Sequence, residues 1–216
     1  EGPAFLEKII QSSFELPLPQ ASDLNAAMYS SINTICGQIN DSDEHHFMNI
    51  FHDGIAPFLT IPRDIVRITN ALSISYPPIK GEVDTASFVT IEILRLYEPT
   101  LYTTIRRNKD RICGVRGRDE DDKATLEELL ECVDKEKRNQ IERILTRLFP
   151  RLENMGYSSD FLKQWDAMRL VCIDTHFDSY FRMSLNDDVM PVSEINSVVS
   201  RCDEEEFIKS YLVNAS

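Results

Sequence analysis

Apolar residues recur along most of this chain at the three- and four-residue spacing of a helix that buries one face. The clearest case begins at Pro62, a residue that the first turn of a helix tolerates. Its stripe consists of Ile65, Ile68 and Leu72, and the helix should end before Pro77. The same spacing predicts further helices over residues 22–39, 45–55, 85–97, 101–107 and 125–148.

The pattern predicts an all-α fold, a mainly helical and irregular bundle. Residues 4–10 favour a short helix, and residues 9–18 favour one short extended segment or strand. No later segment is a convincing partner for such a strand, and a lone strand needs a sheet to join. The chain is therefore expected to begin within something larger, which its lack of an initiator methionine also indicates.

Two short helices are expected over 192–199 and 204–213, and a turn is expected over 40–43. The predicted core residues of the helices are Leu24, Met28, Ile32, Ile35, Ile39, Phe47, Ile50, Phe51, Phe88, Ile91 and Leu94, with Leu96 or Tyr97. Two apolar clusters that contain aromatic residues follow. The first consists of Phe161, Trp165 and Leu170, and the second of Phe177, Tyr180 and Phe181.

Composition narrows the class of protein. The 216 residues are 42% hydrophobic, which is enough for a folded core and excludes a disordered chain. A net charge of −13 argues against general nucleic-acid binding. The cysteines are widely spaced and odd in number, which indicates reduced thiols in a cytoplasmic protein: Cys36, Cys113, Cys132, Cys172 and Cys202. No apolar run approaches the length of a membrane-spanning helix.

Charge is unevenly distributed in the middle of the chain. Residues 106–118 contain six basic residues and one acid, and residues 119–136 contain nine acids and two lysines. We expect the basic run to be neutralised mainly by the neighbouring acidic helix, although contact with phosphate or with a partner's acidic surface is an alternative. Residues 114–123 are the best candidate for a linker or loop.

Two arginines near the start of the Pro62 helix are the candidate binding residues. Arg63 falls in the first turn and Arg67 follows one turn later on the same face. A guanidinium beside free N–H groups at a helix N-terminus favours an anion such as phosphate. By composition alone the alternative is favoured, namely two surface arginines paired with Asp64 or other carboxylates.

Other chemistry has weaker support. The chain contains no Gly-Lys dipeptide and no G-x-G-x-x-G, so it has no phosphate-cradling loop of its own. A metal site built on His45, His46 and His52 lacks the spacing of known zinc motifs. A thiol enzyme built on Cys172 and His176 is disfavoured because Cys172 lies in an apolar run that is typical of a buried thiol.

Several sequence blocks, in order along the chain, resemble one family. These blocks are Phe5–Gln11 with Phe14–Pro19; Pro62, Arg63, Asp64, Arg67 and Asn70; Tyr76 and Pro77 with Lys80–Asp84; Glu92–Tyr102; Leu148–Glu153; and Arg169, Cys172 and His176–Phe181. Together they resemble the KAP family of P-loop NTPases over essentially the whole chain. Any one block alone would be weak support.

The resemblance implies the C-terminal portion of a KAP-type ATPase. Residues 1–20 would end the NTPase core, 21–112 would form a helical lid-like domain, 113–124 a charged loop and 125–216 a C-terminal helical extension. The Walker A lysine and the Walker B acid would lie upstream, so ATP and Mg²⁺ would bind to the parent protein, with no cofactor in this chain. Arg63 would be the nucleotide-sensing arginine, with Arg67 as the second candidate, and no residue here would be catalytic.

The upstream core would then be the first partner of this chain, and a protein partner or a homo-oligomer stays open. Membrane contact would come only through segments outside the chain. Two alternatives remain: a helical protein–protein interaction module with no nucleotide role, as in a bacterial defence or signalling assembly, or an enzyme built on the histidines or thiols named above.

Overall fold

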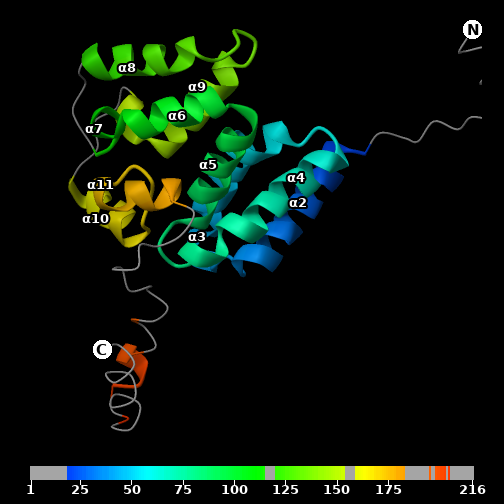
Figure 1. The fold of residues 1–216 in the computed structure, drawn as a ribbon, viewed down its shortest axis with the longest axis vertical. Coiled ribbons are helices and arrows are strands. Elements are labelled where there is room, and N and C mark those ends of the chain that lie inside the picture. Colours follow the sequence, from blue (N-terminus) through cyan, green and yellow to red (C-terminus); the bar gives the residue numbers. More distant parts are fainter. Residues whose placement is uncertain are drawn as a thin grey trace, which may run out of the picture.

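The computed structural model describes residues 19–114, 120–153 and 159–182, with residues 195, 198–202 and 204 (Figure 1). Within these ranges the chain forms helices and no strand, which confirms the all-α prediction. The elements expected over 4–10 and 9–18, and most of the helices expected over 192–199 and 204–213, lie outside the described residues.

The main helices follow in order along the chain. They are α2 (Ala21–Cys36), α3 (Asp41–Ile50), α4 (Pro62–Ser75), α5 (Thr85–Tyr97), α6 (Pro99–Arg107), α7 (Lys109–Ile112), α8 (Glu120–Glu131), α9 (Arg138–Leu148), α10 (Ser159–Ala167) and α11 (Asp174–Phe177). Short turns of π or 3₁₀ helix in the described ranges lie between these helices or after α11: η1 (Phe51–Ile55, π), η2 (Ala56–Phe58), η3 (Pro77–Ile79), η4 (Pro150–Leu152) and η5 (Asp178–Phe181).

Helix α5 is the centre of the fold. It contacts α3, α4, α6 and η1, and every residue from Ala86 to Leu94 is buried. A helix that is covered all round differs from the one-sided stripe expected here, although Phe88, Ile91 and Leu94 are buried as predicted. Helices α2 and α4 pack side by side on one flank, and α6 to α9 lie beyond the far end of α5 (Figure 1).

Helix α2 ends three residues earlier than predicted. Its buried stripe contains Leu24, Met28 and Ile32 as expected, but Gly37 has a φ of +101°, which ends the helix at Cys36. A Cβ at residue 37 would lie 3.5 Å from the Lys80 Nζ, so this ammonium sits at the C-terminus of α2, where the helix dipole favours a cation.

Two expected elements were wrong in their bounds. Residues 40–43, expected as a turn, contain the start of α3, whose N-cap is Asn40. The helix expected over 125–148 is two helices, α8 and α9, separated by residues 132–137. The break carries no proline or glycine; it is held by tertiary contacts, with Lys137 Nζ 2.6 Å from Glu98 Oε1. Helix α8 also begins at Glu120, inside the stretch expected to be a charged loop.

The helices on both sides of residues 115–119 share one hydrophobic core. The Tyr180 hydroxyl accepts a hydrogen bond from the Asp84 N–H at 2.9 Å and donates one to the Arg169 carbonyl at 2.7 Å. The Tyr102 and Phe181 rings also meet, with centroids 5.2 Å apart. The proposed division of the chain at 113–124 stays a prediction.

The basic run is partly neutralised in the way that we expected. Arg111 Nη1 lies 2.7 Å from Glu128 Oε2 of the acidic helix α8. Lys109 instead pairs with Asp178 at 2.9 Å, next to the second aromatic cluster. In the part of the chain that the structure describes, no helix has both the length and the apolar composition that a bilayer crossing requires.

Candidate functional site

The candidate site lies at the start of α4, where Asp64 organises the first turn. The N-cap residue Ile61 is extended, and its N–H and the Thr60 N–H each donate to Asp64 Oδ2 at 3.0 Å. The Thr60 hydroxyl donates to the same oxygen at 2.8 Å. This is one half of a capping box, in which a side chain at the third helical position satisfies N–H groups that the helix leaves free.

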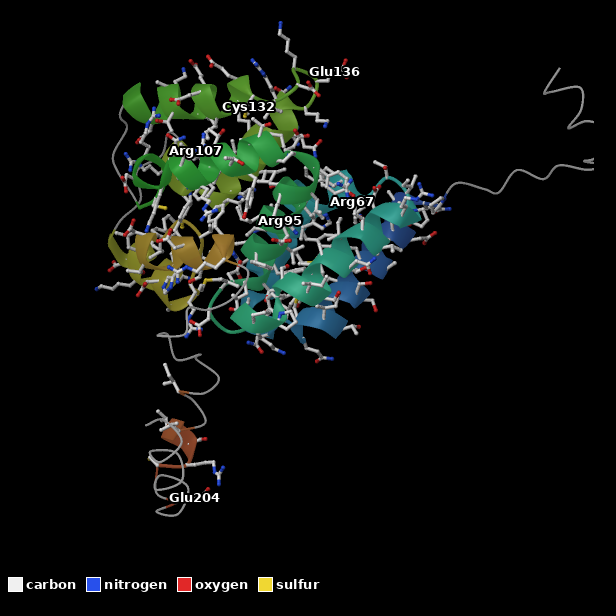
Figure 2. The ribbon with its side chains drawn as sticks, viewed as in Figure 1. Arg67, Arg95, Arg107, Cys132, Glu136 and Glu204 are labelled. Atoms are coloured by element: carbon white, nitrogen blue, oxygen red, sulfur yellow. The ribbon has the colours of Figure 1, made fainter. Side chains whose placement is uncertain are left out.

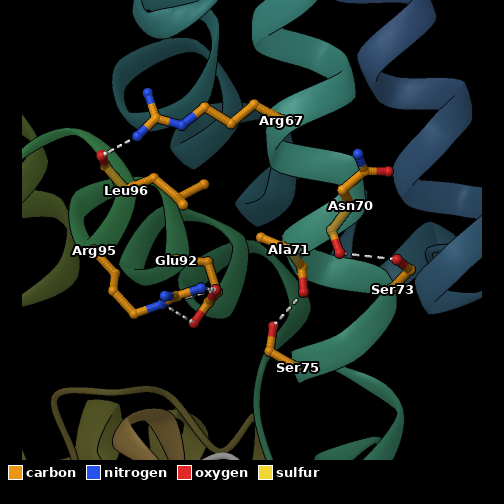
Figure 3. Close-up of polar contacts among 8 residues, drawn as sticks. All are labelled: Arg67, Asn70, Ala71, Ser73, Ser75, Glu92, Arg95 and Leu96. Atoms are coloured by element: carbon orange, nitrogen blue, oxygen red, sulfur yellow. Dashed lines mark hydrogen bonds and ion pairs between the residues drawn. The ribbon is translucent and has the colours of Figure 1, made fainter.

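The same carboxylate reaches across to the end of α5. The Tyr97 hydroxyl donates to Asp64 Oδ1 at 3.0 Å. Arg67 makes a parallel connection, since its Nη2 donates to the Leu96 carbonyl at 2.8 Å (Figure 3). Its guanidinium also lies 4.7 Å from the Tyr97 ring centroid. Asp64 and Arg67 therefore tie the first two turns of α4 to the last turn of α5.

Arg63 has a different environment from Arg67. It is exposed in the first turn of α4, and within the described residues its side chain has no hydrogen bond or ion pair. Both arginines are exposed, as the surface alternative expected, but neither pairs with Asp64 or with another carboxylate among the described residues. The structure leaves Arg63 available to another molecule or domain and commits Arg67 to the α4–α5 contact.

The Asp64 carboxylate also limits what the helix N-terminus can bind. Free N–H groups were expected to help Arg63 to bind an anion, but the Asp64 carboxylate already accepts from Thr60 and Ile61. A second anion at that position would face a carboxylate. Any phosphate contact here therefore depends on the Arg63 guanidinium itself.

The pKa shifts at this junction follow from its hydrogen bonds. Burial tends to raise the pKa of Asp64, but the hydrogen bonds from Ile61, Thr60 and Tyr97 outweigh it and hold that pKa below its usual value. Burial and the bond to Asp64 raise the pKa of Tyr97 to about 12. Tyr97 thus stays a proton donor and Asp64 stays an acceptor at neutral pH.

Asp64→Asn is expected to destabilise the protein by about 1 kcal/mol at neutral pH, the usual scale for losing a helix cap. Because the pKa of Asp64 is lowered on folding, its contribution is present above the unfolded pKa and is lost as the pH falls through the folded pKa. Urea unfolding of both proteins across acidic pH measures this difference. An advantage of the wild type that stays constant into strong acid would contradict the assignment.

An ion pair between a half-buried arginine and a buried carboxylate lies on α5 beside this junction. The Glu92 side chain is only 5% exposed, and Arg95 Nη2 lies 2.6 Å from its Oε2 (Figure 3). The Arg95 Nε also contacts both carboxylate oxygens at 3.1 Å. A buried carboxylate needs such a partner, and nothing in the sequence pattern marked Glu92 as buried.

The histidine and cysteine candidates are not brought together. His46 Nε2 lies 3.5 Å from Asp84 Oδ2, whereas His45 and His52 are exposed. Among the described residues no group of three or more His, Cys, Asp or Glu side chains could hold a metal ion.

The structure also gives no support to a thiol enzyme built on Cys172 and His176. His176 Nε2 contacts Asp166 Oδ1 at 2.9 Å, and burial raises the pKa of Cys172 to about 12, which disfavours a thiolate.

Residues 1–79 match the family model described as the KAP family P-loop domain, and this range contains Arg63, Asp64 and Arg67. The resemblance to the KAP family is thereby confirmed: the chain is related to the KAP-type P-loop NTPases. The Phage T7 exclusion protein of Escherichia coli (strain K12) is 31% identical over 106 residues, which are 47% of this chain and 14% of that protein. The chain thus spans a small part of the relative that it matches, and no solved structure gives a significant match.

Proposed function

We propose that this chain is the C-terminal helical, lid-like and regulatory part of a KAP-type P-loop ATPase, and that it couples nucleotide binding or hydrolysis in the upstream core to a partner. The observation that carries the proposal is Arg63, an exposed arginine with no partner among the described residues, inside the stretch that matches the P-loop domain. A planar guanidinium suits a phosphate because it presents paired donors.

In this proposal, ATP and Mg²⁺ bind to the P-loop domain as a whole. Arg63 fits one contact with a terminal phosphate, and the described residues contain no group of three or more His, Cys, Asp or Glu side chains that could hold a metal ion. ATP with Mg²⁺ would supply a phosphoryl group whose charge an arginine stabilises during transfer. In that chemistry, this chain would contribute one positive charge, the Arg63 guanidinium.

The geometry also supports a coupling role. The turn that carries Arg63 is tied through Asp64 and Arg67 to the last turn of α5. The next residue, Glu98, lies at the α5–α6 joint and pairs with Lys137 just before α9. Contacts between side chains thus run from the proposed phosphate-binding turn to the C-terminal helices, as a movement of the lid would require.

Arg63→Ala, in the full-length product of the gene that encodes this chain, is expected to lower kcat for ATP hydrolysis about 100-fold, the scale for losing one donor to the transition state. The free energy of unfolding should change by less than about 0.5 kcal/mol, because the Arg63 side chain is exposed and has no partner among the described residues. Steady-state turnover and thermal unfolding measure the two effects.

The matched control is Arg143→Ala, which removes an exposed arginine of α9 outside the candidate site. Its turnover should equal that of the wild type. Equal turnover for Arg63→Ala and wild type would remove the proposed role of Arg63.

The name of the relative suggests a second candidate, a helical interaction module in a protein that excludes a phage. The exposed apolar side chains of α4 favour such contacts. A wild-type rate of ATP hydrolysis in Arg63→Ala, together with loss of exclusion in a plaque assay when Ile74 is changed to Asp, would favour this candidate.

A further inference from the structure

Two neighbouring hollows lie between α3 and the end of α10. One has a volume of about 580 Å³ and the other a volume of about 420 Å³. Asp43 of α3 lines both hollows, and so do Ala167 and Met168 at the end of α10, so the two form one continuous cleft. We call it the α3–α10 cleft. Each half has the size of a site for a small organic molecule.

The larger half of the α3–α10 cleft has an aromatic wall. Phe161 is 45% exposed, and its ring lies beside the ring of Trp165, with centroids 6.0 Å apart. Ile50 adds apolar surface, and the amides of Asn49 and Gln164 line the same hollow. An exposed ring beside a second ring suits the binding of a further aromatic ring, because rings attract one another in offset or edge-to-face arrangements.

The smaller half of the cleft carries two cations. Lys80 and Arg169 both line it, and neither side chain has a hydrogen bond or ion pair within the described residues. This is unexpected in a chain with 36 acidic and 23 basic residues, where carboxylates outnumber the cations that they can pair with. An ammonium and a guanidinium in one hollow favour an anionic group of a ligand, such as a carboxylate.

The Arg169 backbone is fixed in a strained conformation. Its φ is +57°, the one positive value among the non-glycine residues that the structure describes. Its N–H donates to the Asp166 carbonyl at 2.9 Å, and its carbonyl accepts from the Tyr180 hydroxyl at 2.7 Å. The left-handed residue after a helix is commonly glycine, so an arginine at this position adds backbone strain. The guanidinium therefore enters the cleft from a turn that is held in place.

Asp43 lies where the two halves of the cleft meet, so its carboxylate stands between the aromatic wall and the two cations. Asp84 also lines the smaller half, but it caps α5, since its Oδ2 accepts from the Ser87 N–H at 2.8 Å. The order of groups along the cleft is thus a ring surface, an anion and a pair of cations. The complementary ligand carries an aromatic ring, an ammonium and a carboxylate in that order.

We propose that the α3–α10 cleft binds an aromatic α-amino acid. Its carboxylate lies against Lys80 and Arg169, its ammonium faces Asp43, and its ring lies against Phe161. These three groups diverge from one carbon atom of the ligand, which matches a cleft whose two halves share Asp43 as a wall. The proposal does not depend on the role of Arg63, which lies outside this cleft.

Isothermal titration calorimetry of the full-length gene product with L-phenylalanine tests this site. Saturable binding is expected. Three probes that each lack one group should bind at least about tenfold more weakly. Phenethylamine lacks the carboxylate, 3-phenylpropionate lacks the ammonium, and L-alanine lacks the ring.

Three variants locate the binding in the α3–α10 cleft. Lys80→Met, Asp43→Asn and Phe161→Ala each remove one proposed contact and should weaken the binding of L-phenylalanine at least about tenfold. Thermal unfolding without ligand shows whether each variant is folded. The matched controls, Lys135→Met and Glu136→Gln, change exposed residues between α8 and α9 and should bind L-phenylalanine as the wild type does (Figure 2).

Two results would overturn the proposal outright: no saturable binding of L-phenylalanine, or equal affinity in the wild type and the three folded variants. Equal affinity for L-alanine would contradict the ring contact in the larger half. Equal affinity for N-acetyl-L-phenylalanine would contradict the ammonium contact and assign the cleft to the C-terminus of a peptide.

Discussion

Arg151→Ala is expected to lower the free energy of unfolding by about 3–5 kcal/mol, the scale for breaking a buried ion pair from one side. Arg151 Nε lies 2.9 Å from Asp122 Oδ1, and both side chains are 9% exposed. Its Nη1 also donates to the carbonyls of Asp110, at 2.9 Å, and Cys113, at 3.1 Å. One guanidinium thus joins η4 to α7 and α8, and its loss leaves a buried carboxylate and two carbonyls without this donor.

Urea unfolding measures this loss, and Arg107→Ala is the matched control. Arg107 is exposed on α6 (Figure 2). Arg107→Ala should therefore lower the free energy of unfolding by less than about 0.5 kcal/mol. Replacing Asp122 by Leu in the Arg151→Ala protein should recover only part of the stability, because the two carbonyls still lack their donor. Equal stability of Arg151→Ala and Arg107→Ala would mean that the ion pair does not hold these helices together.

Gly54→Ala is expected to destabilise the protein by about 1–3 kcal/mol through overpacking. Gly54 is buried in the π-helical turn η1, and a Cβ there would lie 2.8 Å from the Thr90 Cγ2 and 3.0 Å from its Oγ1. Thr90 cannot move easily, because it is fully buried and its hydroxyl donates to the Ala86 carbonyl at 2.9 Å. Close packing of η1 against α5 therefore requires glycine at residue 54.

A double-mutant cycle separates this contact from a general loss of helix stability. Thr90→Ala removes the two atoms that would lie closest to the new Cβ, so Gly54→Ala should destabilise the Thr90→Ala protein much less than the wild type. Thermal or urea unfolding of the four proteins gives the coupling. Additive effects would indicate that Gly54 is needed for a reason other than the approach of Thr90.

At the candidate site, local spacing predicted part of the arrangement. The α4 helix, its start at Pro62 and the exposure of Arg63 follow from the order of apolar and polar residues. The different roles of Arg63 and Arg67 do not follow, since both occupy the same kind of position on the helix. What separates them is that the Leu96 carbonyl lies within reach of Arg67, and no local pattern places Leu96 there.

The sequence by itself determined that this protein is helical, that α4, α5, α6 and α9 begin or end next to prolines, and which residues form most of the core. It also indicated a relationship to the KAP-type P-loop NTPases, which the family-model match supports over residues 1–79. These features are local, because they depend on helical spacing and on the conformations that proline allows.

Only the tertiary structure decided how polar groups pair across the fold. The partner of Asp64, Tyr97, is 33 residues away, and Glu92 became a buried charge because α5 is covered on all sides. The break between α8 and α9 depends likewise on contacts such as Lys137 with Glu98, 39 residues apart. Such pairs depend on which helices pack together, and the spacing of residues within a helix carries no information about them.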